Sequence, residues 1–396
     1  MSDPSRFPRG QASVVGIGCT EYSKDSGVSV FKLATRAVKA AIGDAGLEVG
    51  DIDGFCTYGV NDSIAPNLLA QAFGIQSLSF YVDQNYGGSV SLSMIGQAAL
   101  ALSAGVADCV VCYRAINGRS GQRLNGSTAT AAARLPFDMQ FKMPAGLIAP
   151  SQEIALAARA HMLKYGTTSE DLGRIAVLSR TNALDNERAM MRKPMTMDDY
   201  LASRWIADPF RMFDCCLETD GAVAIVLTRS DRAKDLRHRP VHVQGAAWGG
   251  GITAINNGFT DITDSPAKPI AERVYAAAGL GPDDIDFAEL YDCFTYNVLS
   301  QIEGYGFAEP GSVGERMAAG DFDRSGGALP LNTHGGLLSC AHPGACGGML
   351  HYVEAVQQLR GEAGERQVDG CARAIVTSAS AVASNFSVGI LGAAGT

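Results

Sequence analysis

A short string of residues occurs twice in the chain, 233 residues apart, and it limits the possible folds more than any other feature. Ala45-Gly46-Leu47 is followed four residues later by Asp51-Ile52-Asp53, and Ala278-Gly279-Leu280 is followed at the same distance by Asp284-Ile285-Asp286. In both copies a segment with helical periodicity precedes the string and ends at its glycine. A helix end and turn that recur in this way indicate a duplicated strand–helix unit.

The segments around the two strings follow the same order. In the first half we expect a strand over 14–17, a helix over 26–45, a glycine-rich turn at 86–88, a helix over 89–104 and a strand over 108–113. In the second half we expect a strand over 241–243, a helix over 270–278, glycine-rich turns at 335–348, a helix over 349–359 and a strand over 374–378. This pattern predicts an α/β fold with two stacked mixed sheets and helices between and outside them.

The predicted boundary between the two halves divides the chain into residues 1–235 and 236–396. The more polar segment 116–208, with its methionine and arginine clusters, is predicted to be a helical insertion or lid over the first half. The segment 214–228 is predicted to be a turn followed by a long buried strand.

The composition excludes several functions. The 396 residues are 46% hydrophobic and 18% charged, and their formal net charge is −9. This balance argues against a broad basic surface for nucleic acid or for an anionic membrane. No apolar run has the length of a membrane-spanning helix, and no secretory leader is apparent, so we expect a cytoplasmic protein.

The cysteines and histidines show no pattern typical of a bound metal. The ten cysteines lack a disulfide framework and mostly lie in apolar runs, as buried reduced thiols do. Cys109 and Cys112 are three residues apart in a predicted strand, which places them on opposite faces. No metal site is predicted, because four of the histidines (His161, His238, His242 and His351) have no paired ligand spacing.

The chain also lacks a nucleotide-binding motif. Gly16-Ile17-Gly18 is not followed by the third glycine of a dinucleotide fingerprint, so neither NAD nor ATP is expected. Arg114, Arg119 and Arg123 follow the predicted strand over 108–113. These arginines could contact a coenzyme A phosphate or a partner surface, but arginines in loops are most often solvated, and no phosphate role is assigned to them.

Several further motifs occur in a fixed order along the chain: Asp214-Cys215-Cys216 with Asp220-Gly221-Ala222, Glu289-Leu290-Tyr291-Asp292-Cys293-Phe294, Asn332-Thr333-His334-Gly335-Gly336, and His342-Pro343-Gly344. Their order and spacing resemble the thiolase superfamily over nearly the whole chain. The resemblance is greatest to the sterol-carrier-protein-type thiolases and to the lipid-transfer-protein-like aldolases that cleave steroid side chains. It implies a duplicated βαβαβαββ core, in agreement with the repeat.

The chain departs from the thiolase pattern at the positions of the reactive thiols. In the resembled thiolases a cysteine at the start of a buried helix in the first half becomes acylated, and the helix end lowers the thiol pKa. The matching segment here, 83–91, has no cysteine, and Ser89 and Ser91 are weak nucleophiles near neutral pH. Near the C-terminus, where biosynthetic thiolases have a second cysteine, this chain has Ser378-Ala379-Ser380-Ala381.

The candidate catalytic residues are Tyr291, His342 and Tyr86. Tyr291 and Tyr86 resemble the aldolases, whereas His342 matches the thiolase histidine. We expect His342 to donate to a thioester oxygen on which negative charge develops, and Tyr291 to transfer a proton or hydrogen bond an alkoxide. Tyr86 would either contact the substrate hydroxyl or only pack. Asp292 is interpreted as a helix N-cap, and His334 as a structural or supporting residue.

These features predict a carbon–carbon lyase that cleaves a β-hydroxyacyl-CoA by a retro-aldol reaction, with coenzyme A present only as part of the substrate thioester. By resemblance, the substrate is a steroid or another bulky thioester. The products are then a ketone or aldehyde and acetyl-CoA or propionyl-CoA. The resemblance also implies a homodimer and a small partner chain of OB-fold and zinc-ribbon type in a heterotetramer.

Two alternatives stay open. The first is a thiolase or acyltransferase whose nucleophile has moved to Cys340, Cys346, Cys293 or a serine. The second is a non-catalytic protein of the same fold that binds acyl-CoA or lipid.

Overall fold

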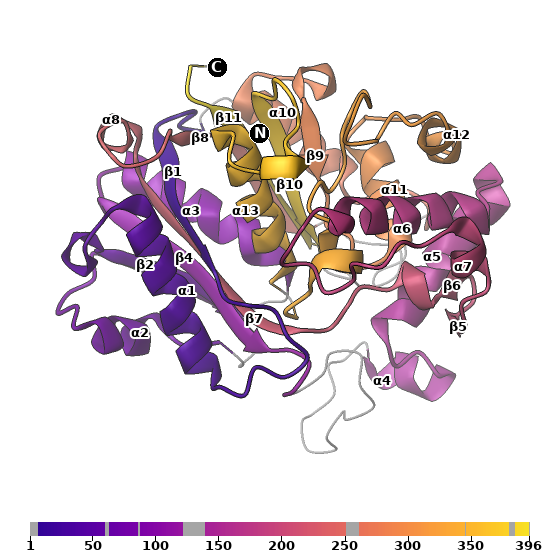
Figure 1. Cartoon of the computed structure of the whole chain (residues 1–396), viewed down its shortest axis with the longest axis horizontal. Helices are drawn as coiled ribbons and strands as arrows, with labels where there is room; N and C mark the ends of the chain where they lie inside the picture. The colour runs from indigo at the N-terminus through magenta and orange to yellow at the C-terminus, as the bar shows by residue number, and fades with distance from the viewer. Residues whose placement is uncertain are drawn as a thin grey trace.

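The computed structural model describes residues 7–59, 63–85, 88–121, 139–250, 261–344, 346–379 and 385–395 (Figure 1). In these residues, nine strands form one mixed sheet in the order β3-β2-β4-β7-β1-β8-β11-β10-β9, and β5 and β6 form a second, small sheet. The strands are β1 (Ala12–Cys19), β2 (Gly54–Gly59), β3 (Phe80–Asn85), β4 (Cys109–Asn117), β5 (Trp205–Ala207), β6 (Phe210–Arg211), β7 (Asp220–Arg229), β8 (Val241–Gly250), β9 (Phe287–Glu289), β10 (Arg373–Ala379) and β11 (Asn385–Ala393).

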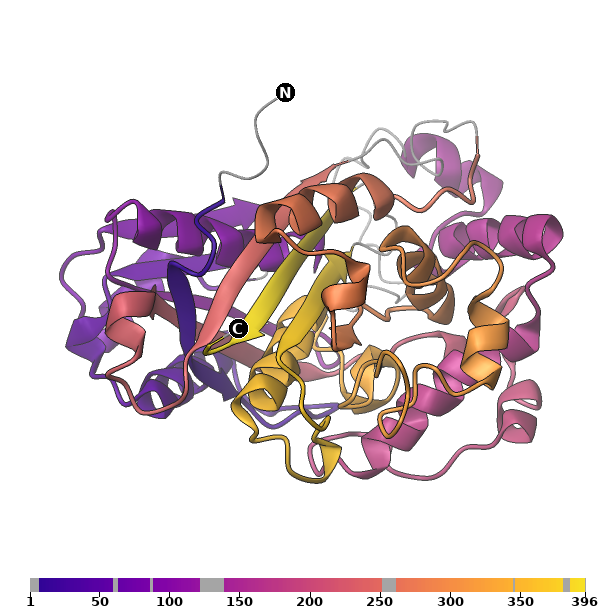
Figure 2. The same ribbon diagram turned by 90° about the horizontal axis from the view of Figure 1, so that it is seen from above.

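The strand order is mirrored about the junction of β1 and β8. The series β1, β7, β4, β2 on one side corresponds to β8, β11, β10, β9 on the other, and Figure 2 shows β8, β11 and β10 side by side. Leu331 forms a parallel bridge with Ala288 of β9, in the place that β3 takes beside β2. Two stacked sheets were expected, one from each half. The two half-sheets also join at their edges into one sheet, because Ser13 and Val14 of β1 pair with β8.

The helices lie between and outside the two half-sheets, as predicted. One hydrophobic core joins α3 and α13 to strands of both halves, so these two helices form the central layer (Figure 1). α1 packs on the outer face of the first half and α10 on that of the second. The helices are α1 (Val30–Ala45), α2 (Pro66–Phe73), α3 (Ser91–Ser103), α4 (Met139–Lys142), α5 (Pro150–Tyr165), α6 (Ser169–Leu184), α7 (Met197–Leu201), α8 (Ser230–Ala233), α10 (Lys268–Ala278), α11 (Thr295–Gly304), α12 (Val313–Ala318) and α13 (Gly347–Arg360).

The repeated string has the same structural role in both halves. Gly46 ends α1 with φ 68° and Gly279 ends α10 with φ 63°, in the left-handed region where a Cβ atom is unfavourable. The Asp53 carboxylate accepts hydrogen bonds from two backbone N–H groups at the start of β4. Asp286 accepts the equivalent two at the start of β10. The sequence repeat therefore corresponds to a repeat of backbone hydrogen bonds.

The described part of the inserted segment is helical, as predicted, but its long helices pack on the second half, and the first half is reached by Arg188, which donates to the carbonyl of Thr20. The helices α5 and α6 pack against α11 and α12 of the second half, beside which they lie in Figure 1. His161 Nε2 lies 3.1 Å from Glu303 Oε2, and the Asn182 and Asn186 side chains donate to the carbonyls of Leu331 and His334. The prediction of a lid over the first half is wrong, because the apolar faces of these helices complete the core of the second half.

The cysteines agree with the sequence analysis. All ten are free thiols. Cys109 belongs to the outer core of the first half and Cys112 to the central core, on opposite faces of β4. In the part of the chain that the structure describes, no helix is long and apolar enough to cross a bilayer.

Candidate active site

Tyr291 follows the end of β9, and its backbone is held from two sides. Its N–H donates to Thr377 Oγ1 on β10 (2.9 Å), and its carbonyl accepts from Gln301 Nε2 on α11 (2.8 Å). The preceding residue, Leu290, hydrogen bonds through both backbone polar groups to the side chain of Asn332, whose φ of 46° is tolerated by asparagine. The phenol is only 3% exposed, so its direction is fixed by the core.

His342 lies between the phenol of Tyr291 and the thiol of Cys216. Its Nε2 atom is 3.3 Å from Tyr291 Oη, and the two rings are nearly perpendicular at 83°. Its Nδ1 atom is 3.1 Å from Cys216 Sγ. The backbone carbonyl of His342 accepts from the N–H of Thr219, which ties it to the loop before β7. Three segments far apart in the chain thus meet at one imidazole.

Burial keeps all three of these side chains uncharged near neutral pH. It lowers the pKa of the His342 imidazole to about 4. It raises the pKa of the Tyr291 phenol well above its usual range. Burial, followed by nearby thiols and by Asp292 and Glu218, also raises the pKa of the Cys216 thiol. The Cys216 side chain is therefore a thiol rather than a reactive thiolate.

Two glycines at the start of α13 allow close packing around Tyr291. A Cβ atom on Gly347 would lie 2.6 Å from the ring of Tyr291, and one on Gly348 would lie within 2.5 Å of Ser91 Oγ and Ser378 Oγ. Ser91 Oγ donates to Ser378 Oγ at 2.7 Å, and Ser378 Oγ donates to the carbonyl of Gly88 at 2.6 Å. The two segments that match the cysteine-bearing segments of the resembled thiolases therefore meet through a hydrogen-bonded pair of serines.

Asp292 supports His342 in a way that the sequence did not reveal. Its carboxylate accepts from the N–H groups of Leu337 (2.7 Å) and Leu338 (3.2 Å), in the π-helical turn Gly336–Cys340 that leads to His342. The interpretation of Asp292 as the N-cap of its own helix is wrong, because α11 begins only at Thr295 after an N-cap at Phe294. Asp292 stabilises another turn instead.

His351 of α13 joins Asp292 to a second buried carboxylate. Its Nε2 lies 3.0 Å from Asp292 Oδ1, and its Nδ1 lies 2.8 Å from Glu289 Oε2. Burial alone would lower the pKa of His351, but the hydrogen bonds to Asp292 and Glu289 raise it to about 9. His334 lies beside the same Glu289.

The other candidate residues lie as follows. Tyr86 and Arg123 are outside the described residues. Cys340, one of the candidate relocated nucleophiles, is 3.4 Å from Asn186 Nδ2 and lines a cavity together with Cys19 and His334. Arg114 is fully buried on β4 beside the ring of Tyr58, so it does not lie in a phosphate-binding loop.

The sequence analysis missed the contact between Cys216 and His342. Asp214-Cys215-Cys216 formed part of the resembled motif, but Cys216 was not singled out as a contact of the histidine. The backbone places it there: Cys216 N–H donates to the carbonyl of Cys293, and the next residue, Leu217, donates to Leu337.

The comparisons with known proteins agree with this architecture. The family model described as thiolase C-terminal domain-like matches residues 254–393. A steroid side-chain-cleaving aldolase of Thermomonospora curvata is 41% identical over 362 residues, which cover 89% of this chain and 91% of that protein. A 17-hydroxy-3-oxo-4-pregnene-20-carboxyl-CoA lyase of Mycobacterium tuberculosis is also 41% identical, over 94% of this chain and 97% of the lyase.

A solved structure named Ltp2-ChsH2(DUF35) aldolase superposes with a TM-score of 0.90 at 40% identity and covers 98% of this chain and 100% of its own. The duplicated core, with a serine pair in the segments that carry the reactive thiols of the resembled thiolases, defines an α/β protein of thiolase type with a buried tyrosine–histidine pair. The chain belongs to the thiolase superfamily.

Proposed function

We propose that this protein is a carbon–carbon lyase that cleaves a β-hydroxyacyl-CoA by a retro-aldol reaction. The observation that carries the proposal is the buried contact of 3.3 Å between Tyr291 Oη and His342 Nε2. A phenol that is itself hydrogen bonded to a neutral imidazole can accept one proton while it passes its own proton on. Retro-aldol cleavage requires such a relay at the β-hydroxyl group.

The proton and electron movements balance in the following way. The β-hydroxyl proton moves to Tyr291 Oη as the phenolic proton moves to His342 Nε2. The hydroxyl oxygen becomes a carbonyl oxygen, and the electron pair of the Cα–Cβ bond becomes part of a thioester enolate. The proton then returns from His342 through Tyr291 to the enolate carbon. The enzyme ends in its starting state, and the products are a ketone or aldehyde and a shorter acyl-CoA.

The start of α13 is the proposed binding site for the enolate oxygen. Gly347 packs against the ring of Tyr291, and the first N–H groups of an α-helix lack acceptors within the helix. Met349 and Leu350 donate to the carbonyl of Cys346, so the proposed donors are the N–H groups of Gly347 and Gly348. Such N–H groups stabilise negative charge, helped by the helix dipole. The expectation that His342 itself forms half of an oxyanion hole stays a prediction, as does the role of Tyr86.

The substrate class follows from the relatives. We propose a steroid CoA thioester, since the lyase of M. tuberculosis is named for 17-hydroxy-3-oxo-4-pregnene-20-carboxyl-CoA. That compound is a β-hydroxyacyl thioester, because the 17-hydroxyl lies on the carbon next to the α-carbon. Retro-aldol cleavage would give a 17-ketone and propionyl-CoA. Coenzyme A enters and leaves as part of the thioester, and no separate cofactor is proposed.

The test is product analysis by mass spectrometry. The purified protein, alone and with a DUF35-type partner chain, is incubated with β-hydroxyacyl-CoAs from short linear compounds to the steroid above. We expect equal amounts of ketone and shorter acyl-CoA from the bulky substrates. Binding of the thioester without any cleavage, in both preparations, would contradict the proposal and favour the non-catalytic alternative.

We also propose a homodimer and a complex with a small DUF35 chain, the OB-fold and zinc-ribbon partner implied by the resemblance. The similar aldolase structure, named Ltp2-ChsH2(DUF35), supports the partner. The dimer is supported by β3, which is the edge strand of the sheet and carries Tyr81 at 68% exposure. Free thiols support a cytoplasmic location. Light scattering of the chain with and without the partner tests both assemblies.

A second candidate function is acyl transfer by Cys216. The contact of 3.1 Å between Cys216 Sγ and His342 Nδ1 favours it, since histidine activates cysteine nucleophiles in many enzymes. The high pKa of the buried thiol argues against it. A stable acyl adduct on Cys216 after incubation with acyl-CoA would support this second function.

A further inference from the structure

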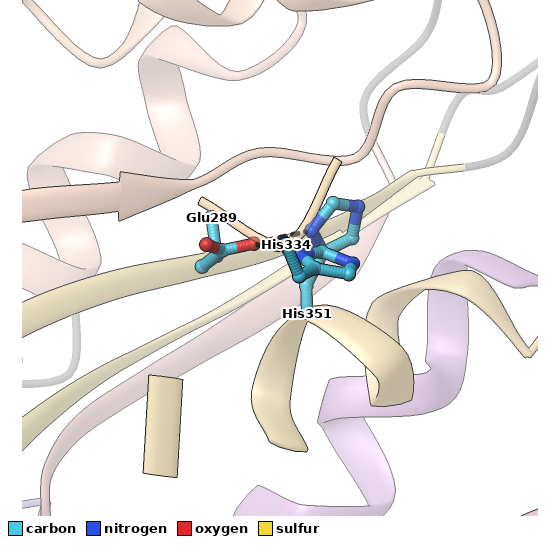
Figure 3. A group of neighbouring side chains, drawn as sticks. All are labelled: Glu289, His334 and His351. Atoms are coloured by element: carbon cyan, nitrogen blue, oxygen red, sulfur yellow. Dashed lines mark hydrogen bonds and ion pairs between the residues drawn. The ribbon is translucent and has the colours of Figure 1, made fainter. Parts of the chain in front are cut away.

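Glu289, His334 and His351 bring a carboxylate and two imidazoles together inside the second half. They come from β9, from the loop after Leu331 and from α13, and Figure 3 shows the three side chains converging. One potential ligand atom of each lies within 4.8 Å of the others. His351 Nδ1 is 2.8 Å from Glu289 Oε2, and His334 Nδ1 is 3.1 Å from the same oxygen.

His334 is the unexplained member of this group. Its side chain is only 5% exposed, yet neither ring nitrogen has a hydrogen-bond partner in the described part of the chain. The 3.1 Å contact with Glu289 lacks the alignment of a hydrogen bond. A buried polar group without a partner costs about 1–3 kcal/mol, so such a group needs an explanation such as an ion that the structure does not contain.

The spacing of the atoms matches a metal site. Two ligands that are each about 2.1 Å from an ion are about 3.0 Å apart at a right angle and about 3.4 Å apart at the tetrahedral angle of zinc. The two distances of 2.8 and 3.1 Å are near the first value, and tetrahedral binding would require the side chains to separate by less than about 1 Å. Two histidines and one carboxylate on one face of the ion, with the other positions open, form a known arrangement for divalent transition metals.

Hydrogen bonds from neighbouring residues orient His351 and Glu289, as the residues around metal ligands commonly do. His351 Nε2 hydrogen bonds the Asp292 carboxylate, which leaves Nδ1 to face the centre of the group. Glu289 Oε1 accepts from the N–H and Oγ1 of Thr333, which leaves Oε2 as the ligand atom. The carboxyl groups of Glu289 and Asp292 both lie within hydrogen-bond distance of the His351 ring, so two acidic side chains flank the place proposed for the cation.

The cavity beside His334 is the proposed route for an ion. Of the three side chains only His334 lines this cavity of about 560 Å³, together with Glu354, Arg188 and Arg366. We propose that Glu289, His334 and His351 bind one divalent transition-metal ion, with zinc as the first choice for two imidazoles and a carboxylate. The proton on His351 Nδ1 leaves to solvent as the metal–nitrogen bond forms.

The proposed ion would have a structural effect on the active site. It would join β9, the loop before the π-helical turn and α13. Because His351 also holds Asp292, and Asp292 holds the turn before His342, the ion would stabilise the position of His342. The ion would not contact the substrate. Its effect would pass from His351 to Asp292, and from Asp292 to the π-helical turn that leads to His342. This inference is independent of the proposed reaction.

The test is metal analysis of the full chain purified without a partner, treated with a chelator and then dialysed against Zn²⁺ or Co²⁺. We expect one ion per chain, a higher melting temperature, and a cobalt spectrum without thiolate charge-transfer bands. His334→Ala should lower zinc affinity at least about 100-fold and still fold, because His334 makes no hydrogen bond in the described structure.

The matched control is His161→Gln, which changes another buried histidine that lies beside a glutamate. It should keep one zinc ion per chain. Absence of stoichiometric metal in the wild-type chain, or an unchanged zinc affinity in both His334→Ala and Glu289→Gln, would overturn the proposal. A cobalt spectrum with thiolate bands would place the metal on cysteines and would overturn it as well.

Discussion

Cys216 contacts the imidazole of His342, and a substitution can show whether it acts as a nucleophile or only orients the imidazole. Burial and nearby negative groups disfavour its thiolate, so we expect it to orient the imidazole only. Cys216→Ala should lower kcat less than about tenfold, whereas loss of a nucleophile typically costs far more. Cys215→Ala is the matched control, since that thiol faces the carbonyl of Arg211 instead. Steady-state kinetics and the intact mass after incubation with acyl-CoA measure both effects; a mass increase on Cys216 would contradict this role.

His342 should make the stability of the protein depend on pH. Its pKa is about 4 in the folded protein and near 6.5 in the unfolded chain. Between these values the unfolded chain binds more protons, so the free energy of unfolding rises as the pH increases from 4 to 6.5 and then levels off. His342→Gln should remove up to about 3 kcal/mol of this change. Urea unfolding at several pH values measures it, and equal pH dependence in both proteins would contradict the assignment.

At the scale of single elements, the glycine that begins α13 controls the approach of this helix to Tyr291. Gly347→Ala would place a methyl group 2.6 Å from the tyrosine ring and from Leu337 in a buried site. The helix or the ring must move, and we expect a drop of at least about tenfold in kcat together with a lower melting temperature.

Gly43→Ala on α1 is the control for this substitution, because a Cβ atom there meets nothing within 4 Å. It should raise stability by up to about 1 kcal/mol and leave turnover unchanged. Turnover and melting temperature of both variants are measured side by side. Full activity in Gly347→Ala would show that the close packing on Tyr291 is not needed.

Element ends could be predicted from the sequence, but the surfaces on which some elements pack could not. Gly46 and Gly279 indicated where α1 and α10 end, because a left-handed residue at a helix end favours glycine. A helical insertion was predicted over 116–208 from its polar composition and its methionine and arginine clusters, yet composition does not say which core the helices α5 and α6 complete. Asp292 was assigned to the nearest helix, whereas its partners, Leu337 and Leu338, lie 45 and 46 residues away.

At the scale of the whole molecule, the two halves use equivalent aspartates for equivalent tasks. Asp53→Ala removes the acceptor for two N–H groups at the start of β4, and Asp286→Ala does the same at β10. Each should cost about 1–2 kcal/mol. The double variant should equal the sum within about 0.5 kcal/mol, because the sites do not share partners. Urea unfolding measures this; a strongly unequal cost would argue against equivalent halves.

The duplication of a strand–helix unit was predicted from the sequence, since the repeat at 45–53 and 278–286 fixes equivalent helix ends and turns. The mirrored strand order and the junction between the halves were not predicted. Only two residue pairs join β1 to β8, and such short pairing leaves no distinct pattern in the sequence. The contacts of His342 could not be predicted from the sequence either. They join residues 51 and 126 positions apart, in loops whose packing depends on the complete fold.

The turnover of Tyr291→Phe with a bulky β-hydroxyacyl-CoA tests the central claim most directly. The variant removes only the hydroxyl group that contacts His342. Tyr305→Phe is the control, because the buried hydroxyl of Tyr305 has no hydrogen-bond partner within the described residues. We predict that Tyr291→Phe lowers kcat by about 100-fold or more with little change in KM, and that Tyr305→Phe keeps normal turnover. Equal release of ketone by Tyr291→Phe and the wild-type protein would contradict a tyrosine–histidine proton relay.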